Sequence, residues 1–210
     1  MGLKQKTMKA LVTQFHQPHG IGGRAAGWVM AHRASNRERN VWAAGLLDVQ
    51  PEDRVLEIGF GPGIAIEAMA RRATRGVVIG VDHSGVMVRQ ATRHNAAAVR
   101  AGRVELRLGT AEDLPEFDAL FDKILAVNSL MFWDDPVTRL QDLRALLQPG
   151  GRIAIAFQPR GPGSTDETAA RAGEDIAAHF ATAGLTDVRV ETLALKPTAV
   201  VCVLGVSPGP

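Results

Sequence analysis

The stretch that decides the fold is Arg54-Val55-Leu56-Glu57-Ile58-Gly59-Phe60-Gly61-Pro62-Gly63-Ile64. An aliphatic run with one acidic residue leads into three closely spaced glycines, and a segment with helical periodicity follows from Ile64 to Arg72. This pattern predicts a strand, a tight turn and the N-terminus of a helix. Glycines let the backbone approach a ligand and adopt positive φ, while the free N–H groups of a first helical turn attract an anion. We therefore expect a ligand-binding turn here.

The spacing of the glycines separates two classes of ligand. A dinucleotide-binding turn has the pattern G-x-G-x-x-G, but the sixth position is Ile64 when counted from Gly59 and Ile66 when counted from Gly61. The pattern G-x-G-x-G after an acidic residue instead resembles the first motif of the class I S-adenosylmethionine-dependent methyltransferases. The resemblance implies that the glycines pass the methionine part of the cofactor and that Glu57 helps to hold its ammonium group.

A second acidic residue, Asp82, ends the next predicted strand. A carboxylate at this place is suited to accept hydrogen bonds from both hydroxyls of a ribose, and in the family it forms the second motif. His83 is expected beside the adenine. The alternative is that the glycines only form a turn and that Asp82 only caps the helix beginning near Ser84. The two motifs together favour the cofactor site.

The composition is that of an ordinary globular protein, with 46% hydrophobic and 22% charged residues in a chain of 210. We expect one compact domain with a substantial core. The net charge of +2 predicts no attraction to nucleic acid or to a membrane. The longest apolar run, residues 199–206, is too short to span a bilayer, and no secretory signal is evident. With a single cysteine excluding an internal disulfide, we expect a cytoplasmic protein of undetermined oligomeric state.

The first 50 residues are predicted to form a layer of helices. Residues 3–15 have the spacing of an amphipathic helix, a glycine-rich loop follows, and a second helical stripe begins at Ala25. Ser35-x-x-Glu38 is the signature of a capping box that opens a third helix, ending at Leu47. We therefore divide the chain into an N-terminal helical lid, residues 1–50, and a cofactor-binding core, residues 51–210. The resemblance implies that the lid covers the cofactor and helps to form the acceptor pocket.

From Pro51 onward, strands and helices alternate as in a doubly wound α/β fold. The predicted strands are residues 54–58, 77–81, 104–108, 121–127, 152–157, 188–193 and 199–206. The predicted helices are residues 64–73, 84–100, 136–147 and 166–183, the last opened by a capping box at Ser164-x-x-Glu167. No helix separates the last two strands, so they pair as a hairpin. The resemblance implies a Rossmann-like, mostly parallel sheet of seven strands in the order 3-2-1-4-5-7-6, with the last strand antiparallel.

Two further turns resemble parts of the cofactor site. Thr110 stands where relatives often carry an aspartate that binds adenine. Its hydroxyl can accept the same hydrogen bond, with Glu112 or Asp113 as substitutes. The alternative is a surface turn that caps a short helix. Asn128 follows the fourth strand, where the family places the methyl group and the acceptor. The residues that the resemblance assigns to the cofactor are Glu57, Gly59, Phe60, Gly61, Gly63, Asp82, His83, Met87, Thr110, Ala111, Glu112 and Asn128.

The sequence after Asn128 bears on the methyl acceptor. Enzymes that methylate an exocyclic amine or amide often have Pro-Pro and an aromatic residue here, but this chain has Ser129-Leu130-Met131, which disfavours such acceptors. Apolar side chains at this turn instead suggest a pocket wall for a flat hydrophobic molecule, although such residues also serve as plain core. The expected substrate-binding residues are Phe15, Trp28, Met131, Phe132 and Trp133.

Methyl transfer is an in-line displacement, and it needs a general base only if the acceptor arrives protonated. For a phenol or thiol, a neutral histidine would serve. The candidates are His16 and His19, which flank the glycine-rich loop, although exposed loop histidines more often have no such role. Asp134 and Asp135 suggest a metal, but capping by Asp135 explains one of them and no third ligand is placed. We therefore expect no metal.

The resemblance covers about residues 51–206. Within the family, the sequence is similar to the small-molecule branch that includes ubiquinone and menaquinone biosynthesis methyltransferases. The resemblance implies S-adenosyl-L-methionine as cofactor and S-adenosyl-L-homocysteine as product. The acceptor is expected to be small and largely apolar or aromatic, and to be methylated on oxygen, with nitrogen, carbon and sulfur as alternatives. Two other classes stay open, a nicotinamide-dependent oxidoreductase, which the glycine spacing opposes, and a non-catalytic cofactor-binding protein. The balanced charge disfavours nucleic-acid methylation.

Overall fold

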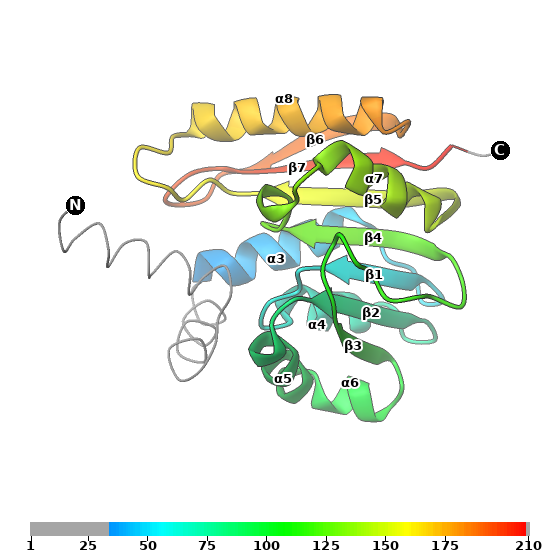
Figure 1. Cartoon of the computed structure of the whole chain (residues 1–210). Coiled ribbons are helices and arrows are strands. Elements are labelled where there is room, and N and C mark those ends of the chain that lie inside the picture. Colours follow the sequence, from blue (N-terminus) through cyan, green and yellow to red (C-terminus); the bar gives the residue numbers. More distant parts are fainter. Residues whose placement is uncertain (1–33, 209–210) are drawn as a thin grey trace.

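Seven strands form one sheet in a computed structural model, which describes residues 34–208 (Figure 1). Their order across the sheet is β3-β2-β1-β4-β5-β7-β6, which confirms the topology that the resemblance implied. The strands are β1 (Arg54–Ile58), β2 (Val77–Asp82), β3 (Val104–Leu108), β4 (Phe121–Val127), β5 (Leu147–Phe157), β6 (Thr186–Leu193) and β7 (Val200–Val206).

The direction of the strands defines the functional edge of the sheet. Strands β1 to β5 run parallel to one another, whereas β7 runs antiparallel to both of its neighbours, β5 and β6. The carboxyl ends of the five parallel strands therefore meet at one edge, toward which their arrows point in Figure 1. Ligands of open α/β sheets bind outside this edge. The turns that leave β1 to β5 are thus the place to look for a site.

Alternate side chains of each strand enter two layers of core, one on each face of the sheet. Val55 packs with residues of the helices on one face, and Leu56 packs with those on the other. Figure 1 shows α8 lying along β6 and β7. The first face carries α3 (Ala34–Leu46), α4 (Ile64–Ala70), α5 (Gly85–His94) and α6 (Ala96–Arg100), and the second carries α7 (Pro136–Ala145) and α8 (Asp166–Thr182).

Helix α3 is an integral part of the core. Its Ala43 and Ala44 are fully buried, and their small size lets α3 pack closely against α4 as well as against β4 and β5. The predicted lid of residues 1–50 therefore contains a helix that the core of residues 51–210 buries. The first two predicted helices lie outside the described residues.

The helix predicted over residues 84–100 is interrupted, which corrects the sequence prediction. Helix α5 ends at His94 and α6 begins at Ala96. Between them, the side-chain amide of Asn95 donates to the carbonyl oxygens of Ala91, at 3.1 Å, and Gly63, at 3.0 Å. A side chain that bonds to nearby backbone competes with the helical hydrogen bonds. The interruption ties α5 to the third glycine of the turn.

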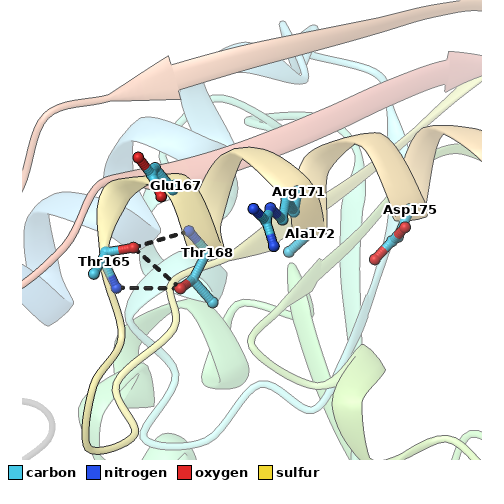
Figure 2. Close-up of a pocket in the computed structure, with 6 residues that line it drawn as sticks. All are labelled: Thr165, Glu167, Thr168, Arg171, Ala172 and Asp175. Atoms are coloured by element: carbon cyan, nitrogen blue, oxygen red, sulfur yellow. Dashed lines mark hydrogen bonds between the residues drawn. The ribbon is translucent and has the colours of Figure 1, made fainter.

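The capping box predicted at the start of α8 is displaced by one residue. Thr165 and Thr168 form it instead of Ser164 and Glu167. The Thr165 hydroxyl accepts from the N–H of Thr168 at 3.2 Å, and the Thr168 hydroxyl accepts from the N–H of Thr165 at 3.3 Å (Figure 2). A threonine hydroxyl thus replaces the glutamate that the signature requires.

Two other predicted boundaries are wrong. Ser35 does not open α3, because the residue before it, Ala34, is already helical, and the Ser35 hydroxyl accepts a hydrogen bond from Arg160 instead. Strand β5 begins at Leu147, in a stretch predicted as the end of a helix and a turn. The cause is pairing with both neighbouring strands, since Leu147 pairs with Phe121 of β4 and the N–H of Gly150 donates to the carbonyl of Ser207, just after β7, at 2.9 Å.

Candidate functional site

The turn between β1 and α4 has the backbone that the glycines were predicted to provide. Gly59, Gly61 and Gly63 have φ angles of 74°, 53° and 83°, which residues with a Cβ rarely adopt. The N–H of Gly59 donates to the carbonyl of Val81 at 2.8 Å, which continues the pairing of β1 with β2. The prediction of a strand, a tight turn and a helix is confirmed.

The three glycines differ in what surrounds them. A Cβ at Gly59 would lie 2.7 Å from the Cβ of Ser129, and one at Gly63 would lie 2.8 Å from the Cβ of Ala91. These two glycines are therefore required by packing. A Cβ at Gly61 would meet no atom of residues 34–208 within 4 Å. The turn thus presents bare backbone to open space at Gly61.

Glu57 lies beneath this turn and is completely buried. Among residues 34–208, neither of its carboxylate oxygens has a hydrogen-bond partner of normal geometry. Burial, helped by the nearby Asp82, raises the pKa of Glu57 to about 8, and the N–H of Ile66 only partly opposes the rise. The free protein therefore keeps Glu57 protonated at neutral pH. A buried acid without partners is stabilised by a cation, and an ammonium group satisfies both its charge and its hydrogen-bonding capacity.

Asp82, the last residue of β2, stabilises the glycine turn through a hydrogen bond. One carboxylate oxygen accepts from the N–H of Gly61 at 2.8 Å, and the other accepts from the N–H of Ser84 at 2.9 Å. Burial raises the pKa of Asp82, while these two donors lower it. Each oxygen keeps a further lone pair, so the carboxylate retains capacity for hydroxyl donors. Ser84, rather than Asp82, caps α5 by accepting from the N–H of Met87, which excludes capping as the reason for Asp82.

The third predicted turn is held by its own side chains. The hydroxyl of Thr110 accepts a hydrogen bond from the N–H of Asp113 at 3.1 Å. Thr110, Glu112 and Asp113 are exposed at the carboxyl end of β3, while Ala111 is half-buried against the core. The hydroxyl is therefore engaged within the turn, and the exposed carboxylates of Glu112 and Asp113 are the acceptors that face solvent.

Asn128 connects the ends of β4 and β5. Its side-chain oxygen accepts from the N–H of Gln158 at 2.8 Å, and its side-chain nitrogen donates to the carbonyl of the same residue at 3.3 Å. Its φ of 54° is positive, which asparagine tolerates better than most residues. These bonds fix the orientation of the Asn128 side chain, and the cofactor contact predicted for Asn128 is open to its backbone and to the remaining lone pair of its amide oxygen.

The apolar residues after β4 do not share one environment. Met131 and Phe132 lie in the short 3-10 helix η1 (Leu130–Phe132) and are 49% and 43% exposed. Trp133 is buried and packs in the core with Leu140 of α7. The exposure of the first two is consistent with the predicted wall of an acceptor pocket, whereas the burial of Trp133 favours the plain core role.

The remaining predicted residues fall into three groups. Phe60 and Met87 are buried core residues, which support the turn from inside. His83 is half-exposed, with Nδ1 3.9 Å from the nearer carboxylate oxygen of Asp82. The predicted base and pocket residues of the N-terminal segment lie outside the described residues, so their roles stay predictions, and these residues are Phe15, His16, His19 and Trp28.

The structure adds residues that the sequence reasoning missed. Asn95 holds the carbonyl of Gly63, as described above. Gln158, fully buried, follows β5 directly, and this position at the carboxyl edge was the signal that could have found it. Arg39 and Arg160 both donate to the side chain of Gln158. No local pattern marks Arg39, which lies in the middle of α3.

A separate hollow lies on the exposed side of α8. Figure 2 shows its lining, which is Thr165, Glu167, Thr168, Arg171, Ala172 and Asp175. None of the residues described above as candidates for the cofactor lines it. Within residues 34–208, no three side chains of His, Cys, Asp or Glu are grouped to hold a metal ion, and no helix is long and apolar enough to cross a membrane.

Comparisons with known proteins identify the class. A family model described as a methyltransferase domain matches residues 55–151, which contain the glycine turn and Asp82. The uncharacterized methyltransferase YdaC of Bacillus subtilis is 32% identical over 183 residues, which are 87% of this chain and 98% of that protein. The chain belongs to the S-adenosylmethionine-dependent methyltransferases and is an enzyme of that class.

Two further relatives extend the comparison. The ubiquinone/menaquinone biosynthesis C-methyltransferase UbiE of Geotalea daltonii is 33% identical over 106 residues, 50% of this chain and 45% of that protein. The solved structure of magnesium protoporphyrin IX methyltransferase from Synechocystis PCC 6803, with S-adenosylmethionine bound, has a TM-score of 0.64 at 15% identity and covers 83% of this chain and 80% of that one. The predicted family, fold and cofactor are confirmed, and an oxidoreductase is not favoured.

The described residues fit this cofactor. S-adenosylmethionine carries an ammonium group, for which the unpartnered carboxyl of Glu57 is a suitable acceptor. It also carries a ribose with two hydroxyls, which the remaining lone pairs of Asp82 suit. The bare backbone at Gly61 leaves room for the cofactor to pass between them.

Proposed function

We propose that this methyltransferase transfers the methyl group to an oxygen atom of a small, largely apolar or aromatic acceptor. The observation that carries the proposal is the exposed pair Met131 and Phe132 at the carboxyl end of β4. Large apolar side chains at the ligand-binding edge of a sheet favour an apolar ligand. Both residues follow β4, which lies beside β1 in the sheet. They are therefore near the glycine turn after β1, along which the cofactor is proposed to pass.

The segment that carries Met131 and Phe132 is hydrogen-bonded directly to the residue before the glycine turn. The Ser129 hydroxyl donates to the carbonyl of Ile58 at 3.1 Å, and Ser129 packs against Gly59. The cofactor supplies a methyl group on a positively charged sulfur, which needs no further activation. The protein therefore acts mainly by aligning donor and acceptor. Holding the two in line lowers the reaction barrier by on the order of 7–11 kcal/mol. A rigid connection between the two turns serves this purpose.

Oxygen is favoured over an exocyclic nitrogen by the hydrogen bonds of Asn128. Its amide already exchanges two hydrogen bonds with the backbone of Gln158, which leaves it less capacity to orient an amine. A hydroxyl acceptor must lose its proton, and we retain His16 and His19 as the proposed bases. Carbon is the second candidate, because the relative UbiE is named a C-methyltransferase.

The test uses S-adenosylmethionine with an isotopically labelled methyl group and a panel of phenols, each paired with its methyl ether. We expect labelled methyl ethers from the free phenols, with one S-adenosylhomocysteine formed per label transferred, and no product from the ethers. A label on a ring carbon would replace oxygen by carbon as the target. Transfer to none of the phenols, by a protein that binds S-adenosylhomocysteine, would contradict the proposed class of acceptor.

A further inference from the structure

Two arginines converge on one neutral oxygen at the carboxyl end of β5. Arg39 Nη1 donates to Oε1 of Gln158 at 2.9 Å, and Arg160 donates to the same oxygen through Nε at 2.9 Å and Nη2 at 2.6 Å. The other end of this amide donates to the carbonyl of Thr198 at 2.7 Å, which turns Oε1 toward the arginines. We call Arg39, Gln158 and Arg160 the arginine cluster.

Arg39 carries a charge and a donor that its described partners leave unsatisfied, although its Nη2 also donates to the side-chain oxygen of Asn36. A guanidinium has five N–H donors, whereas an amide oxygen has two lone pairs. Arg39 is 6% exposed, and its Nε has no hydrogen-bond partner among residues 34–208. Burial and the neighbouring Arg160 lower the pKa of Arg39 to about 9. In the free protein, the positive charge of Arg39 is therefore less stable than it would be in water.

No acidic side chain in the described part of the chain, residues 34–208, forms an ion pair with Arg39. Residues 1–33 and 209–210 contain no Asp or Glu. Within residues 1–210, no acidic side chain therefore neutralises Arg39, and a carboxylate or phosphate of a bound ligand would supply the missing charge.

The arginine cluster adjoins the proposed acceptor wall. Gln158 exchanges two hydrogen bonds with Asn128, and Asn128 leads directly into the helix η1 that carries Met131 and Phe132. The arginines therefore lie beside the place where the acceptor is proposed to bind. A ligand there would meet apolar side chains on one side and two guanidinium groups on the other.

We infer that the arginine cluster binds an anionic oxygen group, a carboxylate or a phosphate, of the methyl acceptor. The inference rests on the proposed function, because it assigns this group to the same acceptor. Guanidinium groups pair with carboxylate and phosphate oxygens through two parallel hydrogen bonds, which neutral ligands cannot match. A purely structural connection between α3 and β5 needs one arginine, and a second on the same oxygen adds repulsion. The acceptor is thus amphiphilic, with an apolar body and an anionic end.

The test is calorimetric titration of the full chain with benzoate, phenyl phosphate and the neutral analogue benzamide, each with and without saturating S-adenosylhomocysteine. We expect the better of the two anions to bind at least tenfold more tightly than benzamide, and the choice between them identifies the anionic group. Arg160→Gln, at an exposed position, should lower the affinity for that anion at least tenfold. Arg37→Gln removes the same charge from α3 at a residue that pairs with Glu67, and should leave the affinity unchanged.

Equal or undetectable binding of all three probes would overturn the inference, and so would unchanged anion affinity in Arg160→Gln. The variant Arg39→Gln is less decisive, because replacing a buried residue risks the fold. Separate titration with S-adenosylhomocysteine distinguishes the two proposals. Cofactor binding without anion preference rejects the arginine cluster alone. Anion preference without cofactor binding rejects the proposed function but keeps the anion site.

Discussion

The raised pKa of Glu57 makes cofactor binding depend on pH, and Glu57→Gln should remove that dependence. With a pKa of about 8, roughly 90% of free protein molecules hold the proton at pH 7. An ammonium beside Glu57 favours the carboxylate, so binding must release this proton. As long as the pKa of the complex lies below the solution pH, the affinity rises about tenfold per pH unit, or about 1.4 kcal/mol.

The assay is calorimetric titration with S-adenosylhomocysteine between pH 6 and pH 7, where the amino group of the ligand stays protonated. Repeating it in buffers of different ionisation enthalpy counts the protons released. We expect about one proton per binding event and about a tenfold rise in affinity for the natural sequence. Glu57→Gln should release none and give a flat profile.

The control is Glu52→Gln, which removes a carboxylate near the opposite end of β1. Glu52 is exposed, and its hydrogen bond with Arg75 lowers its pKa, so it is already ionised in this range. This variant should keep the pH dependence. A flat profile without proton release in the natural sequence would refute the reasoning, since it would mean that Glu57 does not ionise on binding.

Three further predictions concern the free protein. The pKa of Glu57 is higher in the folded than in the unfolded state, so the unfolding free energy should fall, by up to a few kcal/mol, as pH rises from about 4.5 to about 8. In urea titrations, Glu57→Gln should flatten this decline. Gly63→Ala should lower the unfolding free energy by about 3 kcal/mol through positive φ and the contact with Ala91, whereas Gly61→Ala, with positive φ alone, should cost about 1 kcal/mol; equal losses would contradict the packing argument. Cys202, whose burial raises the pKa of its thiol to about 12, should react with iodoacetamide only after unfolding, and mass spectrometry of the native protein would expose an error.

The glycine turn could be predicted from the types and spacing of neighbouring residues. Positive φ at Gly59, Gly61 and Gly63 and a carboxylate at the end of β2 follow from residue type and spacing alone. The strand order came from the family resemblance, because spacing cannot choose between neighbours in a sheet. The strands other than β5 lie within two residues of their predicted ranges, because each is an aliphatic or alternating run bounded by turn residues.

The capping box at Thr165 and Thr168 is a local miss, but two others originate in contacts between distant segments. Helical periodicity continues through Asn95, where the side chain bonds to Ala91 and also to the carbonyl of Gly63, 32 residues earlier. The arginine cluster joins α3 to the segment after β5, with Arg39 and Gln158 separated by 119 residues. Its chemistry depends on burial and on missing carboxylates, and neither is visible in a local pattern.

The most direct test of the cofactor site is a side-by-side titration of the natural sequence and Asp82→Ala with S-adenosylmethionine, S-adenosylhomocysteine and NADH. We predict micromolar binding of the first two, none of NADH, and at least a tenfold loss of affinity, about 1.4 kcal/mol, in the variant. Circular dichroism controls for the loss of the hydrogen bonds from Gly61 and Ser84. Unchanged affinity in a folded Asp82→Ala variant, or preference for NADH, would contradict the site described here.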